Sequence, residues 1–249
     1  MSDKIEYYAK VHSVESFGTV DGPGIRFVLF LQGCNLKCKY CQNRDTWDIH
    51  AGEFKSLDEI FQKILRYKNY IYKNGGVTIS GGEPLIQFEF LIELFKKLKK
   101  EKIHTCIDTS GMVNLTDDIK TLLSLTDLVL LDIKHITKEG YFDITQTNYL
   151  DKFFEFVEQL NKTNVEVWIR QVIIPDVNDN IEYMNNLAIF INKYIKNVTR
   201  VDFLPFHILG NTKYEELGIK NPYKNKEAMD KEKCDQLHKY FLEQLKKSN

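Results

Sequence analysis

The chain has 249 residues, of which 43% are hydrophobic and 28% are charged, and its formal net charge is −1. This composition is typical of a soluble globular protein, and the near-neutral charge gives no indication of a nucleic-acid surface. The strongest apolar run, residues 25–31, contains Arg26 and is far too short to span a bilayer, so no membrane association is expected. The five cysteines do not suggest secreted disulfides and the N-terminus carries no secretory signal, so a cytoplasmic location is predicted.

Strand-like and helix-like segments alternate along the chain. Apolar runs rich in β-branched residues predict strands, and the segments between them show helical spacing of apolar residues. This alternation predicts an α/β fold with a buried parallel sheet under helices, in six βα units rather than the eight of a complete TIM barrel. The predicted strands are 25–31, 77–80, 103–108, 128–133, 165–174 and 198–204. The predicted helices are the segment from Ser56 to the Gly75–Gly76 pair, 88–102, 116–125, 149–161, 181–194 and 226–247.

The segments outside these elements are predicted as loops within one domain that spans residues 1–249. Ser56 and Glu59 have the spacing of a capping box, which marks a helix start. The runs 134–148 and 210–226 are the least regular and are predicted as loops. The turn-forming residues of 18–25 predict a hairpin-like entry into the first strand. Because that run precedes a cysteine-rich segment, it could also line the mouth of a site where a partner enters.

Three cysteines follow the first predicted strand with the spacing C-x3-C-x2-C. Cys34, Cys38 and Cys41 supply three thiolates, so a [4Fe–4S] cube held by them would leave one iron open to a substrate. A structural zinc site usually needs four ligands, commonly from two C-x2-C pairs, and no second pair exists here. Cys106 and Cys234 are isolated in the sequence. The alternative is a zinc knuckle completed by a distant Cys or His.

Polar side chains gather at the carboxyl ends of the other predicted strands. In parallel α/β folds, ligands bind at this edge of the sheet. Six strand ends that offer polar or metal-binding groups to one rim therefore predict an active site. Beyond the cysteines, these groups are Ser80-Gly81-Gly82-Glu83-Pro84, Asp108-Thr109-Ser110-Gly111, Asp132-Ile133-Lys134-His135, Arg170 and Pro205-Phe206-His207.

Some of these residues also have an ordinary structural interpretation. Gly81 and Gly82 can form a tight turn, or they can let the backbone approach a ligand closely and offer its N–H groups. Glu83 suits the first turn of a helix, where it complements the helix dipole. Asp108 and Asp132 can act as caps, although as a pair at one rim they could bind a cation or an ammonium group.

The sequence context also limits what four further side chains can do. Lys134 is expected to face solvent unless the rim is anionic, and a lone His207 is more often a packed or surface residue than a ligand. Arg170 lies in an apolar strand, so a carboxylate partner is expected for it. Tyr40 lies between two of the clustered cysteines and must sit beside any cluster they hold.

These motifs together resemble the radical S-adenosylmethionine (SAM) superfamily, and within it the activases of glycyl-radical enzymes. The resemblance covers nearly the full length and implies a partial (β/α)6 barrel with parallel strands and outer helices. The stretch from Cys41 to Phe54 leaves no room for the ferredoxin-like insert of some relatives. The segments that carry the resemblance are GTVDGPGIRFV, the cysteine run, CQNRDTWD, SGGEP, HTCIDTSG, TDLVLLDIK, VWIR and LPFH.

The resemblance also implies roles for particular residues. Cys34, Cys38 and Cys41 would ligate the cluster, whose open iron would chelate the amino and carboxylate groups of S-adenosylmethionine. Many relatives have His after the third cysteine, where this chain has Gln42. The implied cofactor-binding residues are Tyr40, Cys41, Gln42, Gly81, Gly82, Glu83, Asp132, Ile133, Lys134, His135, Ile136 and His207. The implied ligands of a monovalent cation, Na⁺ or K⁺, are Asp108, Thr109 and Asp132, and the implied residues that grip a partner's glycine loop are Asp21, Gly22, Gly24 and Arg170.

The reaction implied by the resemblance is the activation of pyruvate formate-lyase. Flavodoxin or ferredoxin would reduce the cluster, S-adenosylmethionine would be cleaved to methionine and a 5′-deoxyadenosyl radical, and that radical would take a hydrogen atom from a glycine Cα of the lyase. A monomer is expected. Two alternatives remain open: a radical enzyme that acts on another glycyl-radical protein or on a small molecule such as a deazapurine precursor, and a non-catalytic zinc or iron–sulfur module.

Overall fold

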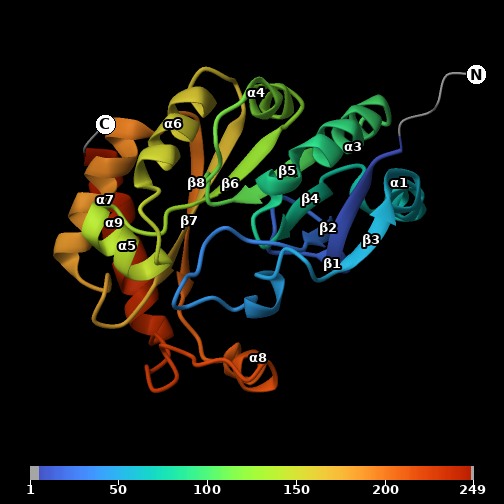
Figure 1. Ribbon diagram of the computed structural model, residues 1–249. Helices are drawn as coiled ribbons and strands as arrows, with labels where there is room; N and C mark the ends of the chain where they lie inside the picture. The colour runs from blue at the N-terminus through green and yellow to red at the C-terminus, as the bar shows by residue number, and fades with distance from the viewer. Residues whose placement is uncertain (1–5, 248–249) are drawn as a thin grey trace, which may run out of the picture.

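The computed structural model describes residues 6–247, which form one curved sheet with helices packed along its outer face (Figure 1). The sheet has eight strands in the order β3-β1-β2-β4-β5-β6-β7-β8, and it is open, with β3 and β8 at its edges. The strands are β1 (Tyr8–Gly18), β2 (Arg26–Leu31), β3 (Glu53–Ser56), β4 (Gly76–Gly81), β5 (Thr105–Thr109), β6 (Leu128–Asp132), β7 (Glu166–Ile173) and β8 (Val198–Pro205).

The six strands from β2 to β8, apart from β3, are parallel, and each pairs with the next along the sheet. These parallel pairings confirm the predicted six-unit partial barrel. Parallel neighbours joined through helices place all their carboxyl ends at one edge of the sheet. The helices are α1 (Leu57–Arg66), α2 (Lys68–Ile71), α3 (Phe88–Lys100), α4 (Asp117–Ser124), α5 (Lys138–Thr145), α6 (Leu150–Leu160), α7 (Ile181–Tyr194), α8 (Asn211–Glu216) and α9 (Lys231–Lys247). Short 3-10 turns occupy Arg44–Thr46 and Pro84–Gln87.

An antiparallel extension at one edge of the sheet was not predicted as strands. β1 pairs with β2 on one side and with β3 on the other, both antiparallel. The pairing of Gly18 with Arg26 closes the hairpin that the turn-rich run 18–25 predicts. Half of β1 is exposed, so its sequence lacks the continuous apolar character of the buried parallel strands.

Two segments predicted as loops contain helices. In the run 134–148, the Thr137 hydroxyl accepts a hydrogen bond from the Gly140 N–H at 3.1 Å and begins α5. In the run 210–226, α8 is short and buries Tyr214. Both helices lie beside the cysteine segment at the same end of the molecule (Figure 1). The carbonyl groups of Ile144 and Thr145, at the end of α5, accept hydrogen bonds from the backbone N–H groups of Lys39 (2.9 Å) and Lys37 (3.0 Å), so α5 helps to fix the cysteine segment.

Helix limits differ from the predictions in two other places. The capping box of Ser56 and Glu59 is present, but the helix it begins ends at Arg66, and a separate turn, α2, follows after Tyr67. The C-terminal helix begins at Lys231 rather than at Lys226. No helix of the described chain is long and apolar enough to cross a membrane.

The side chains on the inner, concave face of the sheet are unusually polar. Alternate residues of a strand point to the same face, so Thr78 and Ser80 of β4 share a face. Ser80 bonds to Asp108 of β5, and Asp108 bonds to Arg170 of β7, so these residues face one another across the interior. Below them the guanidinium of Arg26, which is 0% exposed, bonds to the Thr78 hydroxyl at 2.9 Å. The apolar core lies mainly between the outer face and the helices.

Candidate active site

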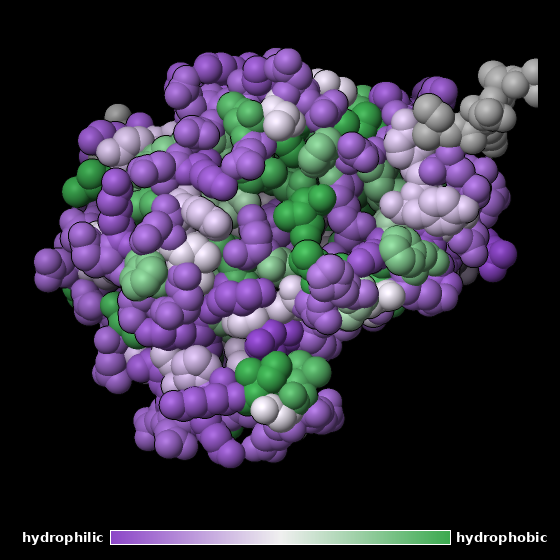
Figure 2. All heavy atoms as spheres, in the orientation of Figure 1, coloured by the Kyte–Doolittle hydropathy of each residue, from purple (hydrophilic) through white to green (hydrophobic). Residues whose placement is uncertain are grey.

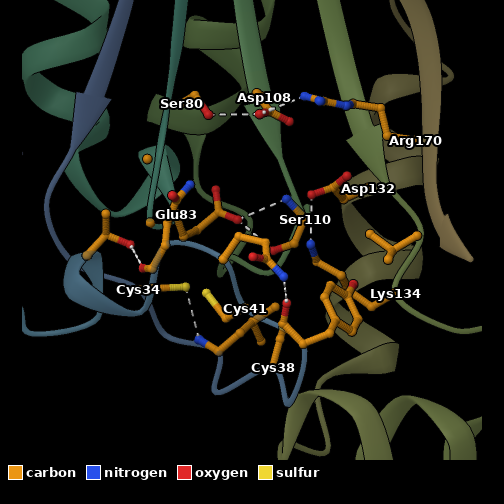
Figure 3. A pocket seen from close by; sticks show the side chains of 18 of the residues that line it. Cys34, Cys38, Cys41, Ser80, Glu83, Asp108, Ser110, Asp132, Lys134 and Arg170 are labelled. Atoms are coloured by element: carbon orange, nitrogen blue, oxygen red, sulfur yellow. Dashed lines mark hydrogen bonds and ion pairs between the residues drawn. The ribbon is translucent and has the colours of Figure 1, made fainter. Parts of the chain in front are cut away.

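A cavity of about 410 Å³ opens where the parallel strands end (Figure 3). Its lining comes from the ends of β4, β5, β6, β7 and β8 and from the cysteine segment that follows β2. The structure therefore brings together, at one rim, groups that are up to 173 positions apart, from Cys34 to His207. The predicted site residues that line the cavity are Cys34, Cys38, Tyr40, Cys41, Gln42, Gly81, Gly82, Glu83, Asp108, Thr109, Asp132, Lys134, Arg170 and His207.

The three clustered cysteines are free thiols at one side of this cavity. The Leu36 N–H points at the Cys34 sulfur at 3.4 Å, and the indole N–H of Trp47 donates to the Cys41 sulfur at 3.1 Å. Burial raises the pKa of the Cys34 thiol to about 12 and also raises the pKa of Cys38 and Cys41. A thiolate at this site therefore needs a strong positive charge beside it, and a bound metal cluster supplies such a charge.

The zinc alternative needs a fourth ligand beside the three clustered cysteines. Within residues 6–247, no group of three or more His, Cys, Asp or Glu side chains is arranged to hold a metal ion, and this includes the three cysteines as they stand. Cys106 and Cys234 are buried elsewhere, and neither lines the cavity. Three thiols around an open space, with N–H donors directed at two of the sulfurs, fit a polynuclear iron–sulfur cluster, whose sulfurs commonly accept such hydrogen bonds.

The Gly81–Gly82 pair brings the end of β4 against the cysteine segment. A Cβ on Gly82 would lie 2.0 Å from the Gly33 carbonyl oxygen, so only glycine fits there. The Gly82 N–H donates to the Leu31 carbonyl at 3.0 Å, and the Glu83 N–H donates to the Gly33 carbonyl at 2.8 Å. Of the two interpretations of the glycine pair, the one in which the Gly82 N–H is offered to a ligand is wrong, because that N–H is bonded to the neighbouring chain, as is the N–H of Glu83.

Glu83 is almost fully buried, with 1% of its surface exposed. Its carboxylate accepts hydrogen bonds from the Thr109 hydroxyl (2.6 Å) and from the hydroxyl (2.6 Å) and N–H (3.0 Å) of Ser110. It also accepts a hydrogen bond from the Leu85 N–H, as expected for a residue at a helix start. Glu83 therefore fastens the end of β5 to the end of β4 and fixes the cavity wall.

Asp108 and Arg170 form a buried ion pair in the cavity, and the predicted carboxylate partner of Arg170 is thereby confirmed. Arg170 Nη1 lies 3.1 Å from Asp108 Oδ2, and the Ser80 hydroxyl donates to the same oxygen at 2.8 Å. Burial raises the pKa of Asp108 to about 6, although Arg170 acts in the opposite direction, and Asp108 in turn raises the pKa of Arg170. The other oxygen, Oδ1, is buried and has no hydrogen-bond partner among residues 6–247, so it can accept a hydrogen bond from a ligand or coordinate a cation.

Asp132 and Lys134 form a second pair at the rim. Lys134 Nζ lies 2.7 Å from Asp132 Oδ2, and the lysine side chain is only 13% exposed. The same ammonium lies 5.8 Å from the centre of the Tyr40 ring. Because Asp132 and Asp108 make the rim anionic, Lys134 faces the cavity rather than solvent (Figure 3).

Gln42 joins the two sides of the cavity mouth. Its amide nitrogen donates to the His207 carbonyl at 2.8 Å, and its amide oxygen accepts a hydrogen bond from the Gly210 N–H at 2.7 Å. The cysteine segment is thus tied to the loop between β8 and α8. The His207 side chain is exposed and lines the cavity, so it is available to a ligand.

Several predicted site residues do not line the cavity. Ile133 is buried in the core, and His135 packs against Tyr183 with a ring-centre distance of 5.2 Å. Ile136 also lies outside the lining, as do Asp21, Gly22 and Gly24. Of these, Asp21 is near the site, because its Oδ1 lies 3.9 Å from Arg170 Nη1.

Gly22 and Gly24 lie at the opposite ends of the strands. A Cβ on Gly24 would lie 1.8 Å from the Asn74 carbonyl oxygen, which places it beside the chain that enters β4. A Cβ on Gly22 would touch the buried Arg26 side chain, with 3.3 Å to its Nε. Direct contact of these two glycines with a ligand in the cavity is not supported by their position.

Some residues that line the cavity had no predicted role of their own. Ser80, Ser110 and Phe206 belong to the strand-end segments that predict the active site, and all three line the cavity. Thr46 and Trp47, at the end of a 3-10 turn after the cysteines, and Val172 of β7 were not predicted as site residues. The only sequence signal for Trp47 is its place in the CQNRDTWD segment.

Comparisons with known proteins agree with this geometry. Residues 28–188 match the family model of the radical SAM superfamily. The chain is 47% identical over 237 residues to the pyruvate formate-lyase-activating enzyme of Clostridium pasteurianum, an alignment that covers 95% of this chain and 98% of that protein. It is 42% identical over 211 residues to the pyruvate formate-lyase 1-activating enzyme of Escherichia coli K12, covering 84% and 85% of the two chains.

Among solved structures, Streptococcus suis SuiB bound to its precursor peptide has the same fold, with a TM-score of 0.68 and 18% identity, over 94% of this chain and 47% of that one. An α/β sheet of this topology with three free cysteines at its carboxyl edge defines a radical SAM protein, and the chain belongs to that superfamily. Within it, the sequence identity over nearly the whole length places the chain in the family of pyruvate formate-lyase-activating enzymes.

Proposed function

We propose that this protein activates pyruvate formate-lyase by creating a glycyl radical on it. Cys34, Cys38 and Cys41 would hold a [4Fe–4S] cluster. When bound, this cluster would supply one electron that breaks a carbon–sulfur bond of S-adenosylmethionine, and the 5′-deoxyadenosyl radical so released would take a hydrogen atom from a glycine Cα. The observation that carries the proposal is that three free thiols and two ion pairs, Asp108–Arg170 and Asp132–Lys134, line one cavity in a chain of this family.

The groups opposite the cysteines suit the zwitterionic part of S-adenosylmethionine. Asp108 Oδ1 is buried and is not bonded to any described residue, so it can accept a hydrogen bond or coordinate a cation. Lys134 and Arg170 provide positive charge within reach of a carboxylate. Tyr40 and Gln42 line the same cavity as the cysteines, where they can contact the adenosine half. His207 at the mouth and Gly81 and Gly82 in the wall complete the proposed cofactor site.

We also infer a monovalent cation, Na⁺ or K⁺, beside the cofactor. Asp108 Oδ1 supports it most directly. Asp132 keeps one oxygen for Lys134 and has a second that the cation could share. Thr109 contributes less than the resemblance implies, because its hydroxyl donates to Glu83 and accepts the Gly111 N–H at 2.9 Å.

The glycine loop of the lyase is proposed to meet Arg170 and Asp21. Both side chains are mostly buried, at 15% and 16% exposure, and they lie 3.9 Å apart inside the barrel. In this proposal Gly22 and Gly24 set the turn that presents Asp21, and they do not touch the loop themselves. The Asp21 carbonyl is held by the Thr78 hydroxyl at 2.6 Å, which supports a fixed position for this turn.

We further propose that flavodoxin or ferredoxin is the electron donor and that the protein acts as a cytoplasmic monomer with one radical SAM domain. The open iron of a three-cysteine cluster is exposed to oxygen, so anaerobic conditions suit the reaction. The experiment that tests the function is anaerobic electron paramagnetic resonance of the reconstituted, reduced protein with S-adenosylmethionine and pyruvate formate-lyase. A doublet from a glycyl radical that requires S-adenosylmethionine is the expected result.

The same experiment distinguishes the alternatives. A reduced-cluster signal that changes on addition of S-adenosylmethionine, without any glycyl radical, would support the radical chemistry. The substrate would then be another glycyl-radical protein or a small molecule. A cluster that ignores S-adenosylmethionine would leave only a binding module and would overturn the proposed function.

A further inference from the structure

A second groove lies on the outer side of the cysteine segment. Its volume is about 220 Å³, and it runs between that segment and the chain that follows α8. Four cationic side chains line it, from Lys37, Lys39, Arg44 and Lys220, and no Asp or Glu is among its lining residues. The groove is therefore strongly cationic in a protein whose formal net charge is −1.

Most of this positive charge is not neutralised locally. Lys39 pairs with Asp143. In the described part of the chain, no carboxylate lies within ion-pair distance of Lys37, Arg44 or Lys220, and the two lysines are exposed. Unpaired cations gathered around one hollow create a local potential that attracts an acidic surface and raises the rate at which it docks.

The indole of Trp47 connects this groove to the cluster site. Lys37 Nζ lies 4.7 Å from the centre of the ring, and the Arg44 guanidinium carbon lies 3.6 Å from it, so both cations stack on the indole. The indole N–H donates to the Cys41 sulfur at 3.1 Å. Among the described residues, Trp47 is shared by the linings of the cationic groove and of the cofactor cavity.

This arrangement suits the entry of an electron rather than the binding of a substrate. The groove adjoins one cluster ligand through a single aromatic side chain, and Lys37 and Lys39 flank a second ligand, Cys38, in the sequence. The face of the molecule seen in Figure 2 is mainly hydrophilic, with apolar side chains near α8 and across its upper centre. A partner at this groove would reach the cluster without entering the cofactor cavity.

We propose that the groove formed by Lys37, Arg44 and Lys220 is the docking site of an acidic electron-transfer protein, with Trp47 positioned between that partner and Cys41. The inference rests on the proposed function, which needs an external electron. In the step that this docking would serve, one electron would pass from the reduced donor to the [4Fe–4S] cluster that Cys34, Cys38 and Cys41 would hold. The donor would become its one-electron-oxidised form, and no bond to the protein would form or break.

The test uses the reconstituted holoprotein and a purified flavodoxin, a small acidic flavoprotein, as the probe. The variant Lys37→Glu/Lys220→Glu reverses two groove charges, and neither residue lines the cofactor cavity. The matched control Lys63→Glu/Lys239→Glu makes the same charge change at exposed residues of α1 and α9. We expect the groove variant to weaken binding of oxidised flavodoxin about tenfold or more at low salt, and the control to change it less than about threefold.

Cluster reduction gives a second, kinetic measurement. Reduction by flavodoxin hydroquinone should slow in the groove variant in proportion to the lost affinity, and the difference should shrink as ionic strength rises. Reduction by dithionite should be unchanged, since that reagent needs no docking surface. Equal binding of flavodoxin by the groove variant and the wild type would overturn the proposal, as would an equal loss in the control pair.

Two further outcomes separate this proposal from others. If the groove variant loses affinity for pyruvate formate-lyase and keeps it for flavodoxin, the groove docks the lyase and the proposal is wrong. If the wild type reduced by dithionite forms no glycyl radical with S-adenosylmethionine and pyruvate formate-lyase present, the proposed function fails whatever flavodoxin does.

The position of Trp47 is tested with Trp47→Phe, which keeps a ring and removes the N–H. We expect it to lower the cluster's midpoint potential, and an unchanged potential would reduce the indole to a packing role.

Discussion

Arg170 and Asp108 form an ion pair whose acidic partner keeps one oxygen free inside the cofactor cavity. Arg170 Nη1 is 3.1 Å from Asp108 Oδ2, while Oδ1 is buried and has no hydrogen-bond partner in the described part of the chain. A buried polar atom without a partner costs free energy, so the site is built to be completed by a ligand. Asp108 thus orients Arg170 with one oxygen and leaves the other as an acceptor for a ligand in the cavity.

The first prediction concerns the pH dependence of cofactor binding. Burial raises the pKa of Asp108 to about 6, above its usual value near 4, so in the folded protein this carboxyl gains its proton as the pH falls through about 6. The protonated form attracts an ammonium group or a cation less strongly. Affinity for S-adenosylmethionine, measured by equilibrium binding to the reconstituted protein, should therefore fall as the pH drops from 7 to 5.

Asp108→Asn supplies the comparison for this pH profile. Asn retains the hydrogen bond from Ser80 but cannot ionise, so binding should be weaker at pH 7 by roughly tenfold and nearly independent of pH between 5 and 7. A variant that keeps the wild-type pH profile would show that another group titrates. Asp117→Asn, an exposed acidic residue in the first turn of α4, is the control and should leave binding unchanged.

The second prediction concerns the stability that Glu83 contributes. Its buried carboxylate accepts three hydrogen bonds from Thr109 and Ser110, two of them at 2.6 Å. Glu83→Gln replaces one acceptor oxygen by an NH2 group that faces donors, so the free energy of unfolding should fall by about 2–3 kcal/mol. Chemical denaturation of the apoprotein measures this loss. Glu89→Gln, at an exposed site in the first turn of α3, should change it by less than about 0.5 kcal/mol.

The third prediction concerns the contact between β4 and the cysteine segment. In Gly82→Ala the new Cβ would lie 2.0 Å from the Gly33 carbonyl oxygen, which is backbone and cannot move aside. The end of β4 must shift away from Cys34, so we expect lower iron incorporation on reconstitution together with a lower Tm. Gly218→Ala serves as the comparison because it has a positive φ of +64° but open space around it. It should cost about 1 kcal/mol and leave iron incorporation intact.

The sequence predicted those features that depend on local pattern. The six parallel strands are apolar runs between turn residues, and their order along the chain dictates that their ends meet at one rim. The carboxylate partner expected for Arg170 was found because a guanidinium in an apolar strand needs one, and Asp108 on β5 provides it. The anionic rim that would hold Lys134 inward also follows from strand-end residues, Asp108 and Asp132.

The features that the sequence did not predict depend on packing between distant segments. α5 is short and weakly amphipathic, and it is stabilised by Thr137 at its start and by its contact with the cysteine segment. The contact of Trp47 with Cys41 exists because the 3-10 turn of 44–46 folds the indole back towards the cysteines. Neither event leaves a periodic pattern in the sequence, and the same is true of the Gly82 approach to Gly33.

The last prediction tests the assignment of the cluster ligands without relying on turnover. Cys38 and Cys106 are both buried, yet only Cys38 lines the cofactor cavity. Replacing either thiol by Ala removes one sulfur atom from a packed site, so both variants should lose about 1 kcal/mol of stability.

Cys38→Ala should in addition lose most of its iron and sulfide after anaerobic reconstitution and should produce no methionine from S-adenosylmethionine. Cys106→Ala should match the wild type in both respects. Full iron and sulfide content in Cys38→Ala would contradict the three-cysteine cluster, whereas equal losses in the two variants would point to misfolding rather than to a lost ligand.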